Sequence, residues 1–383
     1  MVKSFFVLII LPIYLLLFFV LMLTIAFSKY SFKRIKILTL KEDKEENLNE
    51  NVYFSIIIPV RNEEENIKKI LNDIINQSYK NFEVIIVNDH SEDSTIGVIE
   101  SLKDRRIKII HLKNGEYGKK NAILNGLNFA DGEYIILIDA DIKINNNWLK
   151  SYAKKIKSNF EFIIGIVLPI LKGNDFFQFF QFIEYTCMQF FNIGFSFYLK
   201  PFLCSSANLC IKKSVFKKIK NEIKVKIPSG DDVFLLHAYL KNYNKFCINN
   251  YKESIVYFYQ KDKILEFLHQ RLRWASKAKH YKNFFAIFFS FLIYFFSFTF
   301  LIFFVLTIFN FNLFYLIILV TSLYLLTKQL YSFLILCFNK LELNFNFSFK
   351  RLFSFVLLFL VYTFFIGTYS FVYNVKWKGR HYF

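Results

Sequence analysis

The sequence predicts an α/β protein with a doubly wound parallel sheet, attached to transmembrane helices at both ends of the chain. From Phe54 to about Leu168, strand patterns alternate with polar turns and amphipathic segments, which is the order typical of such a sheet. One apolar run, Tyr134–Ile138, is followed by Asp139 and Asp141. Long apolar segments before and after this region have the length that a membrane-crossing helix needs.

The composition favours a membrane protein. Of the 383 residues, 55% are hydrophobic and 20% aromatic, and Phe alone supplies 52. The net charge of +19 fits nucleic acid, an anionic membrane surface or phosphorylated substrates. Because much of the basic charge flanks apolar segments, we expect a lipid bilayer as the partner and no nucleic acid. The cysteines have no C-x-x-C spacing, which predicts free thiols without a disulfide or zinc site: Cys187, Cys204, Cys210, Cys247 and Cys337.

The N-terminal segment is predicted to anchor the chain. Phe5–Phe27 is uninterrupted by charge and lacks a small-residue cleavage site, so it does not fit a signal peptide. Lys29, Lys33, Arg34 and Lys36 follow it, which places the next part of the chain in the cytoplasm. We therefore expect an anchor over residues 1–28 and a linker over residues 29–52.

Residues 53–283 are predicted to form the cytoplasmic domain. No G-x-G-x-x-G motif opens its first strand, which argues against an NAD site. Acidic residues that suit a first helical turn follow that strand. The expected strands are 55–60, 82–87, 107–110 and 134–138, and the expected helix starts lie at Arg61–Glu65, Asp93–Thr95, Lys119 and Val233.

Two segments of this domain are expected near the membrane. Phe176–Leu203 is apolar but interrupted by polar residues, so it should lie at the membrane face or cover the catalytic pocket. Asp262–Tyr281 is predicted to be a cationic, aromatic helix. The C-terminal region, residues 284–383, has three candidate spans: 284–309, 313–338 and 352–373. Three spans would put the basic residues after 373 outside, against the positive-inside tendency; the alternative is that one segment is interfacial or re-entrant.

The strand ends carry the first candidate site. Asp89 follows the second strand, and Asp139 and Asp141 follow a later one. The carboxyl ends of parallel strands meet at one edge of a sheet, where ligands bind. Two carboxylates without Cys or His neighbours suit Mg²⁺ or Mn²⁺ holding a diphosphate. The alternative interpretation of each Asp is a turn or a helix N-cap.

Two further groups are candidates for the reaction itself. Asp231 and Asp232 stand at a helix start, where they either compensate the helix dipole or include a general base. Arg273 and Trp274 precede an apolar span, where they form either an interfacial belt or a site for a diphosphate and a sugar ring. Lys119 is either solvated or a phosphate ligand.

Six motifs in this order resemble the membrane-embedded branch of the family 2 glycosyltransferases, which includes cellulose, chitin and hyaluronan synthases and ceramide glucosyltransferase. The similarity covers about Phe54–Tyr281. The motifs are Ile58–Glu63, Val87–Asp89, Gly118–Ala122, Asp139–Asp141 (D-x-D), Gly230–Asp232 and Gln270-x-x-Arg273-Trp274 (Q-x-x-R-W). Two features depart from the family: Gly-Asp-Asp stands where many members have Thr-Glu-Asp, and the spans are few for threading a polymer.

The resemblance implies a GT-A fold, a UDP-sugar donor, a divalent cation (Mg²⁺ or Mn²⁺) and inversion at the anomeric carbon. It implies a donor site of Pro59, Arg61, Glu63, Asp89, Lys119 and Asp139, a metal site of Asp141 and Asp139, a catalytic base Asp232 beside Asp231, and an acceptor and diphosphate end of Gln270, Arg273 and Trp274.

We therefore expect a multi-pass protein of the inner or plasma membrane, with a cytoplasmic catalytic domain, that transfers a hexose or N-acetylhexosamine to a lipid or lipid-linked acceptor. A processive polysaccharide synthase with the same site is one alternative. A catalytically inactive membrane scaffold is the other.

Overall fold

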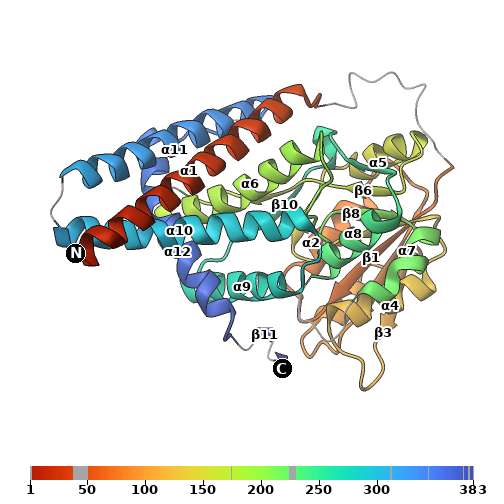
Figure 1. Cartoon of the computed structure of the whole chain (residues 1–383). Helices are drawn as coiled ribbons and strands as arrows, with labels where there is room; N and C mark the ends of the chain where they lie inside the picture. Colours follow the sequence, from red (N-terminus) through yellow and green to blue (C-terminus); the bar gives the residue numbers. More distant parts are fainter. Residues whose placement is uncertain are drawn as a thin grey trace.

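The computed structural model describes residues 2–37, 51–173, 175–223, 230–310, 313–343, 345–373, 375–377 and 380–382. An α/β domain lies at one end of the molecule, and long helices from both ends of the chain lie together at the other (Figure 1). Residues 38–50 of the expected linker (29–52) and residues 224–229 before Gly230 lie outside the described residues.

The α/β domain is built on a seven-stranded sheet in the order β3-β2-β1-β4-β8-β6-β9. Strands β1 to β4 are parallel neighbours, as predicted, whereas β8 runs antiparallel to both β4 and β6. The sheet is therefore mixed. Its strands are β1 (Phe54–Val60), β2 (Phe82–Asn88), β3 (Ile107–His111), β4 (Tyr134–Leu137), β6 (Phe162–Ile164), β8 (Leu209–Lys212) and β9 (Phe246–Ile248).

Both faces of this sheet are covered, which explains why β1 and β4 read as continuous apolar runs. Side chains of alternating strand positions belong to two separate apolar cores, one on each face. The helices of the domain are α2 (Ile67–Ile75), α3 (Thr95–Glu100), α4 (Gly118–Phe129), α5 (Trp148–Lys157), α7 (Lys213–Ile219) and α8 (Asp231–Asn242). Helix α4 packs closely on the sheet because Gly126 has no side chain; a Cβ there would lie 2.7 Å from Ile57.

A smaller sheet and two helices join this domain to the apolar helices. Strands β5 (Ile142–Lys143), β10 (Val256–Tyr259) and β7 (Val167–Ile170) form the sheet, in that order. It leads into α6 (Phe176–Ser196) and α9 (Ile264–Ser276), and a 3₁₀ turn, η4 (Lys277–His280), continues α9. Helix α6 contacts both α1 and β7, so it covers the domain on the side of the apolar helices. Of the two expectations for this segment, this position corresponds to the one at the membrane face.

Within the described residues, four helices are long and apolar enough to cross a membrane. They are α1 (Val2–Arg34), α10 (Phe284–Asn310), α11 (Leu313–Lys340) and α12 (Phe349–Ser370). Helices α1, α10 and α11 run roughly side by side, and α12 crosses them (Figure 1). A short hairpin of β11 (Val375–Trp377) and β12 (Arg380–Tyr382) follows α12.

Some predicted boundaries were wrong. The helix expected from Arg61 begins only at Ile67, because Asn62 has a φ of 51° and the backbone N–H of Glu63 donates to Thr95 Oγ1 at 2.8 Å. Helix α1 extends through residues 29–34, which were assigned to the linker.

Candidate active site

Two strand ends bring the predicted carboxylates to one edge of the sheet. Ile57 of β1 is the register partner of Leu137 of β4, and Val60 is the partner of Asn88 of β2. Asp89 therefore follows β2 at the level where β1 ends. Asp139 follows β4 near the same level, because the backbone N–H of Ile138 still donates to Ile57.

Asp89 is fixed by its neighbours. It is only 2% exposed, and its Oδ2 accepts a hydrogen bond from the backbone N–H of Gly118 at 2.9 Å. Gly118 begins α4 with a φ of 88°, a conformation that favours glycine. The Gly118–Lys119 motif therefore connects the start of α4 to the end of β2 and sets where the next side chain points.

Lys119 links three carboxylate and hydroxyl groups at the centre of the site. Its Nζ lies 2.5 Å from Asp139 Oδ1, 2.8 Å from Ser206 Oγ and 4.0 Å from Asp231 Oδ2. Burial alone would lower the pKa of Lys119, but Asp139 and Asp231 raise it above its ordinary value. Lys119 is therefore a fixed positive charge between the D-x-D motif and α8.

The D-x-D pair keeps its two carboxylates on the cavity wall. Burial raises the pKa of Asp139, and Lys119 only partly offsets this shift. Asp139 and Asp141 both line the cavity. No third His, Cys, Asp or Glu joins them as a metal ligand among the described residues. Two carboxylates completed by substrate phosphates and water suit Mg²⁺ or Mn²⁺, so the residues fit a cation that arrives with a diphosphate.

Asp231 and Asp232 face this group from the start of α8. Gly230, with a φ of 88°, precedes them. Burial would raise the pKa of Asp231, yet Lys119 and Lys120 hold it below its ordinary value. Asp231 Oδ2 is buried without a hydrogen-bond partner, and the Lys119 ammonium lies 4.0 Å from it.

Asp232 is oriented by backbone and by a second lysine. Its Oδ1 accepts from the Val233 N–H at 2.7 Å, and its Oδ2 accepts from the Ser206 N–H at 3.3 Å. Lys277 Nζ lies 3.8 Å from Asp232 Oδ1. Burial would lower the pKa of Lys277, but Asp232 raises it. The carboxylate thus stands in a positive environment while one side remains toward the cavity.

The loop that carries Ser206 is held by a buried amide. Asn208 is fully buried and accepts hydrogen bonds from Trp148 Nε1 at 3.0 Å and the Tyr152 hydroxyl at 2.7 Å. Its Nδ2 donates to Ile166 and Ser254 carbonyls. Every polar atom of this amide is engaged, so the loop is rigid where it contacts Lys119 and Asp232.

All of the predicted site residues line one cavity of about 1770 Å³. The group comprises Pro59, Arg61, Glu63, Asp89, Lys119, Asp139, Asp141, Asp231, Asp232, Gln270, Arg273 and Trp274. The structure therefore brings together residues from six distant motifs, although their individual roles stay predictions.

Sequence reasoning missed Ser206 and Lys277. Ser206 stands beside another serine, and neither residue gives a chemical signal in the sequence. Lys277 had a weak signal, because it lies four residues after Arg273, on the same side of a helix. Both became visible only when α8 and α9 were placed against α4.

Comparisons with known proteins give a family match within the α/β domain. Residues 55–220 match the sequence model of the family described as Glycosyl transferase family 2. An uncharacterized glycosyltransferase of Bacillus subtilis, YkcC, is 32% identical over 136 residues, which are 34% of this chain and 42% of that protein. The GalNAc(5)-diNAcBac-PP-undecaprenol beta-1,3-glucosyltransferase of Campylobacter jejuni is 32% identical over 125 residues, 31% of this chain and 40% of that protein. The chain thus spans less than half the length of both relatives.

One solved structure resembles nearly the whole chain. It is a mannosyltransferase from Pyrobaculum calidifontis in complex with GDP-Man and Mn²⁺, with a TM-score of 0.56 and 13% identity over 94% of this chain and 99% of that one. At this identity the similarity concerns the fold. It confirms the predicted GT-A fold with apolar helices at both ends.

Proposed function

We propose that this chain, whose residues 55–220 match the Glycosyl transferase family 2 model, is an integral-membrane enzyme that transfers a sugar from a UDP-sugar to a lipid or lipid-linked acceptor with inversion. The observation that carries this proposal is the single cavity in which Asp139 and Asp141 face Asp231 and Asp232, with Lys119 between them.

The donor would lie along the strand ends. Asp89, which accepts a hydrogen bond from the backbone N–H at the start of α4, would contact the nucleoside. Asp139 lies next to Lys119. A divalent cation held by Asp139 and Asp141 would neutralise the diphosphate and help it to leave. Lys119 and Arg273 line the same cavity and would add positive charge for the diphosphate.

The proposed general base, Asp232, would act on the acceptor during the transfer itself. An acceptor hydroxyl oxygen attacks the anomeric carbon, the bond from that carbon to the diphosphate oxygen breaks, and UDP leaves with the bonding electrons. Asp232 accepts the hydroxyl proton as the new bond forms. Its backbone contacts to Val233 and Ser206 hold the carboxylate in one orientation, which is what a general base requires. Direct displacement from the face opposite the diphosphate inverts the anomeric centre.

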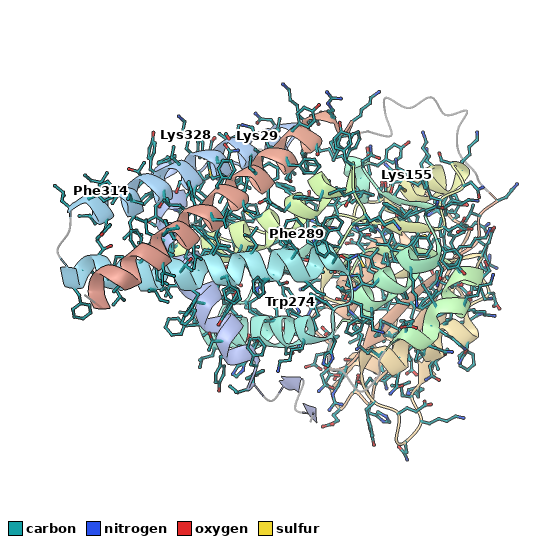
Figure 2. The ribbon with its side chains drawn as sticks, viewed as in Figure 1. Lys29, Lys155, Trp274, Phe289, Phe314 and Lys328 are labelled. Carbon is teal, nitrogen blue, oxygen red and sulfur yellow. The ribbon has the colours of Figure 1, made fainter. Side chains whose placement is uncertain are left out.

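The lipid acceptor is supported by the position of this cavity. Gln270, Arg273 and Trp274 sit on α9, and η4 connects α9 almost directly to the long apolar helix α10. Trp274 on α9 and Phe289 on α10, both labelled in Figure 2, line the same cavity. One relative acts on an undecaprenol-linked glycan by its name. An acceptor reaching this site from a bilayer therefore fits better than a soluble one.

The test is nucleotide release by the full chain purified in detergent. UDP-glucose, UDP-galactose, UDP-GlcNAc, UDP-GalNAc and GDP-mannose are offered with Mn²⁺ or Mg²⁺ and a bacterial lipid extract, and products are resolved by size. A single glycolipid band that disappears in the Asp232→Asn variant supports the proposal. A ladder of products would instead identify a polysaccharide synthase, and absence of both nucleotide binding and turnover would indicate an inactive scaffold.

A further inference from the structure

The cavity is larger than the proposed donor site requires. Its volume of about 1770 Å³ exceeds the ~300–1,000 Å³ that is usual for small-molecule sites. The additional space lies between α1, α6, α10 and α12, where the wall includes Leu21, Met188, Phe191, Phe355 and Phe359. One continuous space therefore joins the carboxylates to the apolar helices.

The membrane-side part of this space suits hydrocarbon. None of the lining residues that α1, α10, α11 and α12 contribute within the described chain is charged. The polar groups among them are uncharged hydroxyls, of small side chains such as Ser290 and Thr363 and of Tyr294 and Tyr362. An apolar space of this kind does not hold water, so a lipid chain is the occupant that its surroundings can supply.

The space reaches the outer surface of the apolar helices. Ile287 and Phe291 of α10 line the cavity and are 47% and 59% exposed, and Phe371, just after α12, is 65% exposed. These side chains would face lipid in a bilayer. A chain can therefore pass from the bilayer into the cavity sideways, without leaving a hydrophobic environment.

Helix α12 indicates the leaflet from which the chain comes. Near its start, Arg351 donates to the carbonyl of Asp175, which caps α6. Just past its end, the Phe371 carbonyl accepts from Lys279 of η4. At about 1.5 Å per residue, its 22 residues extend about 33 Å, so a spanning helix could not keep both ends at elements of the same domain. With α6 and η4 both at the cytoplasmic surface, as the proposed function has it, α12 would lie along that surface rather than cross the membrane.

We infer that the space between α6, α10 and α12 binds the hydrocarbon chain of the acceptor lipid, which enters from the cytoplasmic leaflet under α12. This inference rests on the proposed function and adds a chain-binding site to it. The lipid's polar head then lies at the junction near Trp274 and Tyr185, within the same cavity as Asp232. Transfer efficiency should depend on chain length as well as on the head group.

The direct test is photolabelling of the full chain in vesicles of phosphatidylcholine and phosphatidylglycerol. The probe is a diacylglycerol that carries a diazirine midway along one acyl chain. We expect saturable labelling of peptides covering 286–296 and 355–371, competed by unlabelled diacylglycerol, and non-saturable labelling of the lipid-facing start of α11. Saturable labelling does not require turnover, so it survives a failure of the proposed function.

Tryptophan substitutions inside and outside the apolar part of the cavity are the matched variants for this test. Thr363→Trp and Ser290→Trp place a large side chain in it, whereas Phe365→Trp changes a residue of α12 that is 61% exposed and does not line the cavity. The first two should reduce saturable labelling several-fold, and the third should not. UDP affinity checks that each variant is folded.

A sugar-transfer assay distinguishes failure of the chain-binding site from failure of the proposed function. With dioleoylglycerol and dioctanoylglycerol as acceptors, the filled variants should lose transfer to the long chain more than to the short one. Equal loss for both chains, or saturable labelling that survives both substitutions, overturns the chain-binding site. If the wild-type chain transfers sugar to no lipid acceptor, the proposed function is overturned instead.

Discussion

Arg271 of α9 and Glu184 of α6 form a buried, bidentate ion pair beneath the Q-x-x-R-W motif. Arg271 Nη2 lies 2.6 Å from Glu184 Oε2, and Nε donates to both carboxylate oxygens at 3.0 and 3.1 Å. The guanidinium stacks 4.4 Å from the centre of the Trp274 ring, and its Nη1 donates to Gln270 Oε1 at 2.6 Å. A residue between the motif positions therefore holds two of the motif side chains in place.

This pair predicts a characteristic stability pattern. Arg271 is 4% exposed and Glu184 is 15% exposed, so Arg271→Met leaves a largely buried carboxylate without its ion-pair partner, although the Tyr362 hydroxyl still donates to it at 3.3 Å, and should cost about 3–5 kcal/mol of unfolding free energy. Glu184→Met should cost a similar amount, while the double variant recovers most of it because no charge stays buried. Thermal unfolding in detergent measures all three, and activity at saturating donor shows whether the KM for the acceptor rises with the loss of the Trp274 contact.

The control is the exposed pair of Lys263 and Glu266 on the same helix, with exposed fractions of 81% and 53%. Glu266→Gln should leave the melting temperature unchanged, as exposed pairs contribute little. A double variant no more stable than the single ones would show that Arg271 and Glu184 act independently.

Replacing the proposed base should separate binding from chemistry. Asp232→Asn keeps an acceptor for the Val233 N–H but removes the proton acceptor, so kcat should fall by roughly 10²–10⁴. UDP affinity, measured by calorimetry, should stay unchanged. Asp131→Asn, at an exposed carboxylate paired with Lys108, is the control that keeps full activity. Residual activity near the wild-type value would exclude Asp232 as the base.

The D-x-D pair should control the effect of the cation on nucleotide binding. Asp141→Asn removes one proposed ligand, so the gain in UDP affinity on adding Mn²⁺ should fall by roughly tenfold or more. UDP affinity without added cation should change little. Calorimetry with and without Mn²⁺ measures both quantities. An unchanged Mn²⁺ effect would move the cation away from Asp141.

Lys119 gives a prediction for pH dependence. Its charge lowers the pKa of both Asp139 and Asp231, so Lys119→Met should raise both values. Cation and donor binding needs ionised carboxylates, and a raised pKa means that protonation begins at a higher pH. The acid limb of UDP–Mn²⁺ binding should therefore move upward by about one pH unit or more.

Titrations of UDP binding between about pH 4 and pH 7 cover the relevant range. Lys108→Met is the matched control, because Lys108 pairs with Glu83 and Asp131 outside the cavity. If the acid limb moves downward or not at all, Lys119 does not support these carboxylates.

Residues whose position depends on strand order could be predicted from the sequence. Asp89 and Asp139 follow apolar runs, and parallel strands bring such ends together whatever the rest of the fold does. The start of α2 could not be predicted from the sequence, because Asn62 turns the backbone and the Glu63 N–H donates to Thr95, a residue far along the chain. Such partners exist only after β1 and β2 have paired.

The direction of β8 and the contacts between helices could not be predicted from the sequence either. The expectation of a parallel sheet missed β8, because Leu209–Lys212 has only four residues and its antiparallel direction depends on how the chain returns to the sheet after α6. The contact of Lys277 with Asp232 depends on how α9 docks against α8. No local pattern encodes such docking, because it results from the packing of whole helices.

The orientation of α12 predicts which side of the membrane its end occupies. Because Arg351 contacts the cap of α6 and Lys279 contacts Phe371, the end of α12 should be on the same side as the catalytic domain. Val372 is 72% exposed and Leu313, at the start of α11, is 69% exposed. In a cysteine-free background, Val372→Cys should therefore react with a membrane-impermeant maleimide only from the cytoplasmic side, and Leu313→Cys only from the other. Reaction of both from one side would mean that α12 crosses the membrane, and the lipid chain would then have to enter by another route.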